Sequence, residues 1–189
     1  MPRLRFSTRT TSLGAVLLGL LFLTAGCEQD PYLPGYSFYP QPAAVNVMHR
    51  GPTEQTPLTT LATVVGVRRP DANKNEPSAI VIRLRFENNG PAHLTFDPQT
   101  LELVNGALRP FQSPQVQPAF VLELPPGQKQ EITAAFPLPS GFRPEQINLR
   151  NLRLRWQVKL DNYDIPQSAI FEQGAGTASS YREAPPETY

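Results

Sequence analysis

Side chains that could carry out catalysis or bind a metal ion are few in this 189-residue chain. There is one cysteine, Cys27, and there are two histidines, His49 and His93. A hydrolase needs a nucleophile beside a base, and zinc sites use several Cys and His ligands. One cysteine and two histidines are too few to make either kind of site a favoured interpretation. Met48 beside His49 offers half of a copper site, but the second methionine is Met1, at the start of a segment that we expect to be removed. We therefore expect no catalytic residue, no cofactor and no metal site.

Cys27 follows a segment that is organised like a secretory signal. Arg3, Arg5 and Arg9 precede the uncharged run 10–26, whose apolar centre reads "LGAVLLGLLFL" and which ends in small residues. A membrane-spanning helix needs about 20 apolar residues, and this centre is roughly half of that length. The segment therefore predicts a cleaved signal rather than a permanent span. With no second cysteine, Cys27 cannot form an intramolecular disulfide, which leaves lipidation, or an unprocessed or intermolecular thiol.

The residues "LTAGC" (23–27) resemble the lipobox of bacterial lipoproteins. Thr24 departs from the pattern, which usually has leucine three places before the cysteine. The resemblance implies that a diacylglyceryl group is attached to the Cys27 sulfur and that the signal, 1–26, is cut off before it. Glu28 follows the cysteine where an inner-membrane retention signal commonly has aspartate. We therefore expect a lipid-anchored protein of the cell envelope, residing in the outer membrane and facing the periplasm.

The charge of the processed chain argues against nucleic acid as a partner. The full chain has a formal net charge of +1, and loss of residues 1–26 removes three arginines and no acidic residue. The remaining 14 basic and 16 acidic residues give a net charge of −2. Nucleic-acid-binding domains usually carry a clear basic excess. The expected partners are the membrane, through the lipid on Cys27, and another envelope protein.

The composition after Cys27 divides the chain into three parts. Residues 28–57 contain six prolines, which oppose both helices and central strands, so 27–57 is predicted to be a lipidated, Pro- and aromatic-rich tether. Its aromatic cluster, 32–39, either docks on a partner or folds back onto the domain. Residues 58–172 are predicted to form one folded domain. The polar segment 173–189 is predicted to be a disordered tail.

Alternating apolar and polar residues predict an all-β domain. The segments 80–87 and 152–161 alternate with period two, as half-buried strands do, and Trp156 falls on the inward face with Arg155 outward. Weaker strands are expected at 61–67, 101–104, 120–124, 131–136 and 168–172, separated by turns rich in Asn, Gly, Pro and Asp. One short helical turn is expected within "PSGFRPEQINLR". About seven short strands predict a two-sheet antiparallel β-sandwich.

The order of these segments resembles the immunoglobulin-like domains of bacterial envelope proteins. The residues that match are the turn Asn88–Gly90 after one strand and the turn Pro125–Gly127 before another. The cysteine pair of antibody domains is missing. The resemblance implies a non-catalytic module that binds another protein or stabilises an envelope complex.

The alternative function is that of a small-ligand or polysaccharide-binding lipoprotein. It requires Tyr163 and Phe142, in two expected loops, to converge in a pocket. An exposed apolar patch along an edge strand would instead favour a protein partner.

Two basic stripes on the outward strand faces leave a further choice. Arg83 and Arg85 form one stripe, and Arg153, Arg155 and Lys159 form the other. They either bind acidic groups or keep the sheet faces soluble and unpaired, and the interspersed acidic residues favour the second interpretation.

Overall fold

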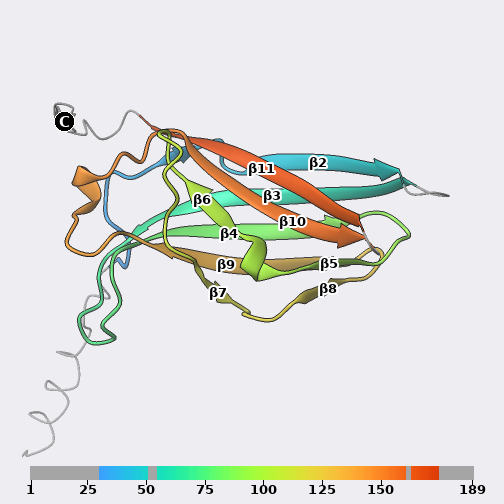
Figure 1. Cartoon of the computed structure of the whole chain (residues 1–189), viewed down its shortest axis with the longest axis horizontal. Helices are drawn as coiled ribbons and strands as arrows, with labels where there is room; N and C mark the ends of the chain where they lie inside the picture. The colour runs from blue at the N-terminus through green and yellow to red at the C-terminus, as the bar shows by residue number, and fades with distance from the viewer. Residues whose placement is uncertain (1–29, 51–54, 161–162, 175–189) are drawn as a thin grey trace, which may run out of the picture. The chain divides into compact units, whose positions relative to one another are not determined.

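A computed structural model describes residues 30–50, 55–160 and 163–174 of the chain. From Pro31 onward these residues form two antiparallel sheets packed face to face (Figure 1). The five-stranded sheet has the order β2 (Ala43–Arg50), β3 (Gln55–Arg68), β4 (Ala79–Asn88), β9 (Lys129–Pro137), β7 (Gln115–Gln117). The six-stranded sheet has the order β1 (Phe38–Tyr39), β11 (Tyr163–Gln173), β10 (Leu152–Leu160), β5 (Leu94–Phe96), β8 (Leu122–Leu124), with β6 (Glu102–Val104) also paired to β10. The predicted all-β, two-sheet sandwich is confirmed.

Apolar side chains from both sheets fill the space between them. Phe86 of β4 and Phe96 of β5 pack with ring centroids 4.6 Å apart across this layer. Trp156 is 1% exposed and is the largest fully buried side chain among the described residues, whereas Arg155 beside it is exposed. The predicted register of β10 is therefore confirmed, because a slip of one residue would have exchanged these two side chains.

The sandwich has more strands than the seven that the sequence predicted. Each of the seven predicted segments overlaps a strand, although β6 and β8 begin one and two residues later than predicted, and the expected helical turn is the short 3-10 helix η2 (Pro144–Gln146). A second 3-10 helix, η1 (Pro98–Thr100), follows β5. The strands that were not predicted are β1, β2, β5 and β7, of which three have only two or three residues. Such strands are too short for a period of two to stand out.

The folded unit also begins earlier than residue 58, its predicted start. The predicted tether includes β1 and β2, and β2 pairs with β3 from Ala43↔Ala62 to Arg50↔Gln55. Before them, the Leu33 N–H donates to the Val67 carbonyl (2.8 Å). Proline disfavours central strands. However, β2 is an edge strand of its sheet, and none of the prolines of the predicted tether lies within β2. Residues 1–29 and 175–189, which hold the predicted signal and most of the predicted tail, lie outside the described residues.

Most of the aromatic cluster at 32–39 folds back onto the sandwich. Phe38 is completely buried between the sheets, and Tyr36 packs against the same core. Tyr32 covers a small apolar cluster on the outer face of the five-stranded sheet, which includes Val81. Its ring would lie 3.3 Å from a Cβ at Gly66, whose φ of 153° suits few L-residues, so glycine is required at this bulge of β3. Tyr39 remains exposed.

Asn88 joins the two turns on which the immunoglobulin-like resemblance rests. Its buried side-chain amide donates to the carbonyls of Ala92 (2.7 Å) and Leu124 (2.8 Å), and its Oδ1 accepts from the Gly90 N–H. The Asn88 carbonyl accepts from the Gly127 N–H (2.8 Å). One buried side chain thus holds the loop after β4 against the loop after β8.

Candidate functional site

Cys27 lies outside the described residues, so lipidation at this position stays a prediction. Among the described residues, no helix is both long and apolar enough to cross a bilayer. The candidate sites described below are therefore hollows and exposed side chains on the surface of the sandwich.

Phe142 and Tyr163, which a polysaccharide site would bring together, lie at opposite ends of the sandwich. β10 begins at Leu152, shortly after the loop that carries Phe142, and it ends at Leu160, which pairs with Tyr163. Nine residues of an extended strand separate the two ends by roughly 26 Å. The two rings do not share a pocket.

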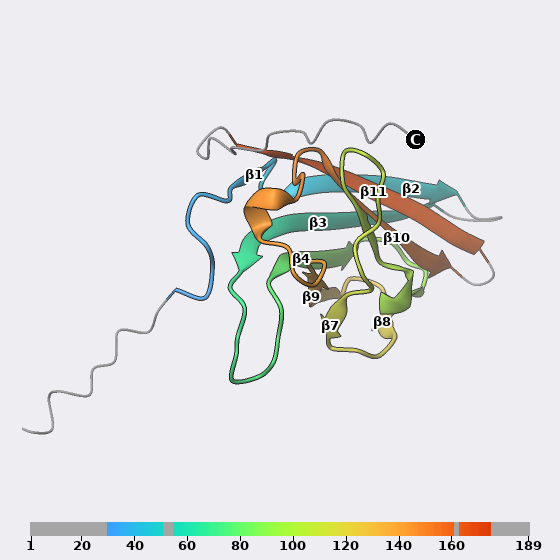
Figure 2. The same cartoon turned by 60° about the vertical axis from the view of Figure 1, so that its left-hand side comes forward.

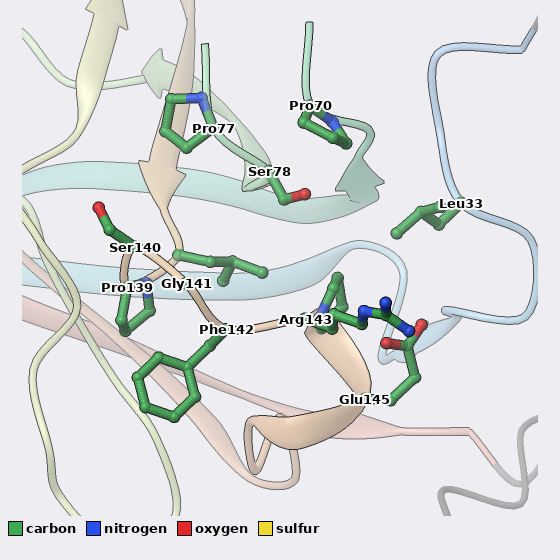
Figure 3. Close-up of a pocket in the computed structure, with 12 residues that line it drawn as sticks. Leu33, Pro70, Pro77, Ser78, Pro139, Ser140, Gly141, Phe142, Arg143 and Glu145 are labelled. Carbon is green, nitrogen blue, oxygen red and sulfur yellow. The ribbon is translucent and has the colours of Figure 1, made fainter. Parts of the chain in front are cut away.

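Phe142 borders a hollow at its own end of the sandwich (Figure 3). The hollow has a volume of about 380 Å³ and lies between the β3–β4 loop, the β9–β10 loop and Leu33. Figure 3 shows the Phe142 ring directed away from the hollow, and this side chain is 57% exposed. Four of the twelve lining residues are prolines, and the charged side chains in the walls are Arg143 and Glu145.

Glu145, also in the wall of this hollow, interacts with Tyr36. Burial, the negative charge of Glu145 and a hydrogen bond to its carboxylate together raise the pKa of Tyr36 to about 12. The Tyr36–Glu145 pair connects the segment before β1 to the β9–β10 loop, so we assign it a structural role.

A second hollow opens along one margin of the sandwich, between the edges of the two sheets. β7 is the last strand of the five-stranded sheet and β8 the last of the six-stranded one, and Figures 1 and 2 show both at the same margin. The hollow at this margin lies between η1 and the segment around β7, and it has a volume of about 480 Å³. We call it the edge groove, and it is lined by Pro98, Gln99, Leu101, Ser113, Pro114, Val116 and Ala119.

Exposed apolar side chains continue from the edge groove. Phe120 and Val121 follow Ala119 in the β7–β8 connection and are 66% and 50% exposed. The sequence predicted these residues as the start of a strand, but β8 begins only at Leu122. An aromatic ring exposed to water beside a groove is typical of a protein-binding surface.

The cations of the basic stripes are largely paired. Arg83 lies 3.3 Å from Glu131, Arg85 lies 2.9 Å from Glu87, and Arg155 lies 3.4 Å from Glu102. These exposed pairs contribute little free energy, but they neutralise the sheet faces. The pairing favours the interpretation that the stripes keep these faces soluble.

The two histidines are not brought together with other metal-ligating groups in the part of the chain that the structure describes. His93 lies 3.2 Å from Glu123 on the surface, and the side chains of Met48 and His49 lie outside the description. Across residues 30–50, 55–160 and 163–174, no group of three or more His, Cys, Asp or Glu side chains is placed to hold a metal ion.

No protein-family model matches the sequence. Among solved structures, the yjhA protein from Bacillus subtilis is similar over 58% of this chain and 88% of that chain, with a TM-score of 0.38 and 15% sequence identity. The assignment of the fold rests on the strand pairings of this chain itself.

The sequence offered little sign of the edge groove. Its walls come from 98–101 and 113–119, two loop segments that are brought together only because β7 crosses to the other sheet. A useful sign was the cluster "SPQVQPAFV", in which an apolar pair directly follows a segment with two prolines.

Proposed function

We propose that this protein is a lipid-anchored lipoprotein of the cell envelope that uses a non-catalytic β-sandwich to bind another envelope protein. The lipobox-like residues 23–27 support the anchoring, with Cys27 as the lipidated residue. Glu28 supports residence in the outer membrane, facing the periplasm. The observation that carries the binding function is the edge groove with Phe120 exposed beside it.

The edge groove suits an apolar segment of a protein better than a sugar. Five of its seven lining residues are Pro, Leu, Val or Ala. Interface energies concentrate in aromatic side chains that become buried on binding, and Phe120 has most of its surface available for this. A sugar site would need several polar groups that point to one place.

The two edge strands beside the groove are short, with three residues each, so strand addition is not the expected mode of binding. Side chains of the partner should instead fill the groove and pack on Phe120 and Val121. This mode makes the interaction sensitive to single side-chain changes.

Site-specific photocrosslinking in intact cells tests this proposal. A crosslinking amino acid at Ser113, on the wall of the groove, should give a discrete adduct with another envelope protein. Phe120→Asp should abolish the adduct, because a carboxylate cannot be buried unpaired at an apolar interface. Tyr163→Asp is the matched control, since Tyr163 is also 55% exposed but lies on β11, three strands away from β8.

The adduct should survive the control substitution at an unchanged level. Absence of any discrete adduct, or equal loss with both substitutions, would remove the edge groove from the proposed function.

A further inference from the structure

The first residues of the folded unit are fixed to one end of the sandwich. The Pro31 carbonyl accepts from the Arg69 N–H (2.9 Å), and the Leu33 N–H donates to the Val67 carbonyl (2.8 Å). Between them, Tyr32 is bridged to Arg68, the last residue of β3. The chain therefore joins the sandwich exactly where β3 ends.

Cys27 precedes Pro31 by only four residues. Four extended residues span at most about 14 Å, which is less than half of a bilayer's thickness. The predicted tether of some thirty residues would have allowed any orientation of the domain. If Cys27 carries the lipid, as the proposed function has it, the end of the sandwich where β3 ends must lie at the membrane surface.

Three loops share this end, which we call the anchor end: 69–78 between β3 and β4, 138–151 between β9 and β10, and 105–109 after β6. β4 begins, β9 ends and β10 begins here, because Ala79 pairs with Pro137 and both lie beside these loops. The loop 105–109 is held there by a hydrogen bond from the Gly106 N–H to the Arg150 carbonyl (3.1 Å). The first two loops lie at the left-hand end of the sandwich in Figure 1.

Two of these loops present an apolar side chain next to an arginine. Leu108 is 63% exposed and precedes Arg109, and Phe142 is 57% exposed and precedes Arg143. Figure 3 shows the Phe142 ring pointing outward from its loop. An apolar side chain with a long cationic neighbour suits the boundary between lipid headgroups and acyl chains, since the arginine reaches phosphate while the apolar group is buried.

The loop around Leu108 is held rigidly in the conformation that exposes it. Asn105 Oδ1 accepts from the N–H groups of Ala107 (3.0 Å) and Arg109 (2.9 Å), and the Asn105 carbonyl accepts from the Leu108 N–H (2.8 Å). Leu108 itself has a φ of 59°, in the left-handed region that is unfavourable for a leucine. An unfavourable backbone conformation that exposes an apolar side chain to water is explained if that side chain is buried in lipid when the protein is bound to a membrane.

The three loops of the anchor end hold five basic and three acidic residues, and this basic excess matches an anionic membrane. Arg109, Arg143 and Arg150 are exposed in its loops, and none of them belongs to a salt bridge among the described residues. By contrast, the cations on the sheet faces are mostly paired, as shown above. Basic side chains are attracted to an anionic lipid surface, so three arginines without salt bridges strengthen the attachment that the lipid anchor provides.

We propose that the anchor end rests on the lipid surface, with Leu108 and Phe142 inserted among the headgroups and the three arginines against the phosphates of anionic lipid. This inference rests on the proposed lipidation of Cys27. It fixes the orientation of the domain, with the strands standing away from the membrane. The edge groove, on a lateral margin, then opens parallel to the membrane surface and is accessible to a neighbouring envelope protein.

The single cysteine makes a direct test of this orientation possible. When its sulfur carries lipid, Cys27 cannot react with a thiol label, so Phe142→Cys and Tyr163→Cys each supply one reactive thiol. The full processed lipoprotein is labelled with an environment-sensitive fluorophore and reconstituted into vesicles of phosphatidylethanolamine and phosphatidylglycerol. The vesicles include lipids with a nitroxide quencher near the headgroup.

The label at 142 should shift its emission to shorter wavelength and be strongly quenched by the nitroxide lipid. The label at 163 should keep its water-like emission and be quenched several-fold less, because it lies roughly 26 Å further from the membrane. Replacing phosphatidylglycerol by phosphatidylcholine should weaken the quenching at 142, since the arginines lose their anionic partners.

Three results would overturn the inference: equal quenching at both positions, a water-like label at 142, or a blue shift at 142 without quenching by lipid. The third would place a protein surface, such as a second copy of this chain, on the anchor end. The chain without an added cysteine separates this failure from that of the proposed function. If it takes up the thiol label, Cys27 is free and the anchoring itself is wrong; if it does not, the anchoring stands and only the orientation fails.

Discussion

A buried hydrogen bond between the two sheets allows a quantitative test of the core. The Thr60 hydroxyl of β3 donates to Oε1 of Gln167 of β11 at 2.8 Å, and the two residues are 0% and 5% exposed. Gln167 lies opposite Trp156 in the β10–β11 pair. The remaining polar atoms here, Gln167 Nε2 and Trp156 Nε1, are buried and have no hydrogen-bond partner among the residues that the structure describes.

Removing either partner alone should cost more than removing both. Thr60→Val keeps the shape of the side chain but leaves the whole Gln167 amide buried and unpaired, which costs about 1–3 kcal/mol in the free energy of unfolding. Gln167→Met should cost less, because it also removes the unpaired Nε2. In the double variant no polar group of the pair remains, so its stability should return to within about 1 kcal/mol of the parent.

The assay is urea unfolding of the processed chain from residue 28 onward, followed by the fluorescence of its single tryptophan. The chain must include β1 and β2, because both belong to the folded unit. The structure predicts a favourable coupling of about 1–3 kcal/mol between the two substitutions. If their effects add without coupling, or if Thr60→Val is neutral, the two side chains do not meet between the sheets.

Three further changes test other parts of the structure. Trp156→Ala should cost about 3–5 kcal/mol by loss of burial and by the cavity left behind, whereas Arg155→Ala, on the outer face, should change stability by about 0.5 kcal/mol; equal costs in urea unfolding would refute the register of β10. Asn88→Ala should lower the free energy of unfolding by about 1–3 kcal/mol, because carbonyls in two loops lose their hydrogen-bond donor. A thermal unfolding curve like that of the parent would refute the role of Asn88 in joining the two loops. The raised pKa of Tyr36, about 12 against about 10 in the unfolded chain, means that the neutral phenol stabilises the fold below pH 10 and that this contribution is lost as the pH rises from 10 through 12. Glu145→Gln should lower this pKa in a spectrophotometric titration that uses Tyr36→Phe as the reference, and an unchanged pKa would contradict the pairing.

The strands that could be predicted from the sequence are those with one solvent-exposed face and one buried face. In β10 every second side chain is buried, so its pattern alone placed Trp156 inside and Arg155 outside. β4 follows this rule only in its second half. At its start Val81 is buried as well, because Tyr32, almost fifty residues earlier, covers the outer face there.

The predictions that failed concern contacts between residues far apart in the sequence. Six prolines in 28–57 suggested a tether, yet the segment between Pro42 and Pro52 contains none of them and forms the edge strand β2. Phe142 and Tyr163 were both expected in loops, but local sequence does not tell at which end of a sandwich a loop falls. The edge groove likewise depends on the order of strands, which becomes known only with the pairings.

The measurement that tests the central proposal most directly is mass spectrometry of the N-terminal peptide of the protein purified from its own membranes. The peptide should begin at Cys27 and carry the mass of a diacylglyceryl group on its sulfur. Replacement of Cys27 by Ser should leave residues 1–26 attached and abolish the uptake of labelled fatty acid. A parent peptide with a free Cys27 thiol, or a Cys27→Ser variant that is still fully acylated, would contradict the proposal that this protein is a lipoprotein anchored at Cys27.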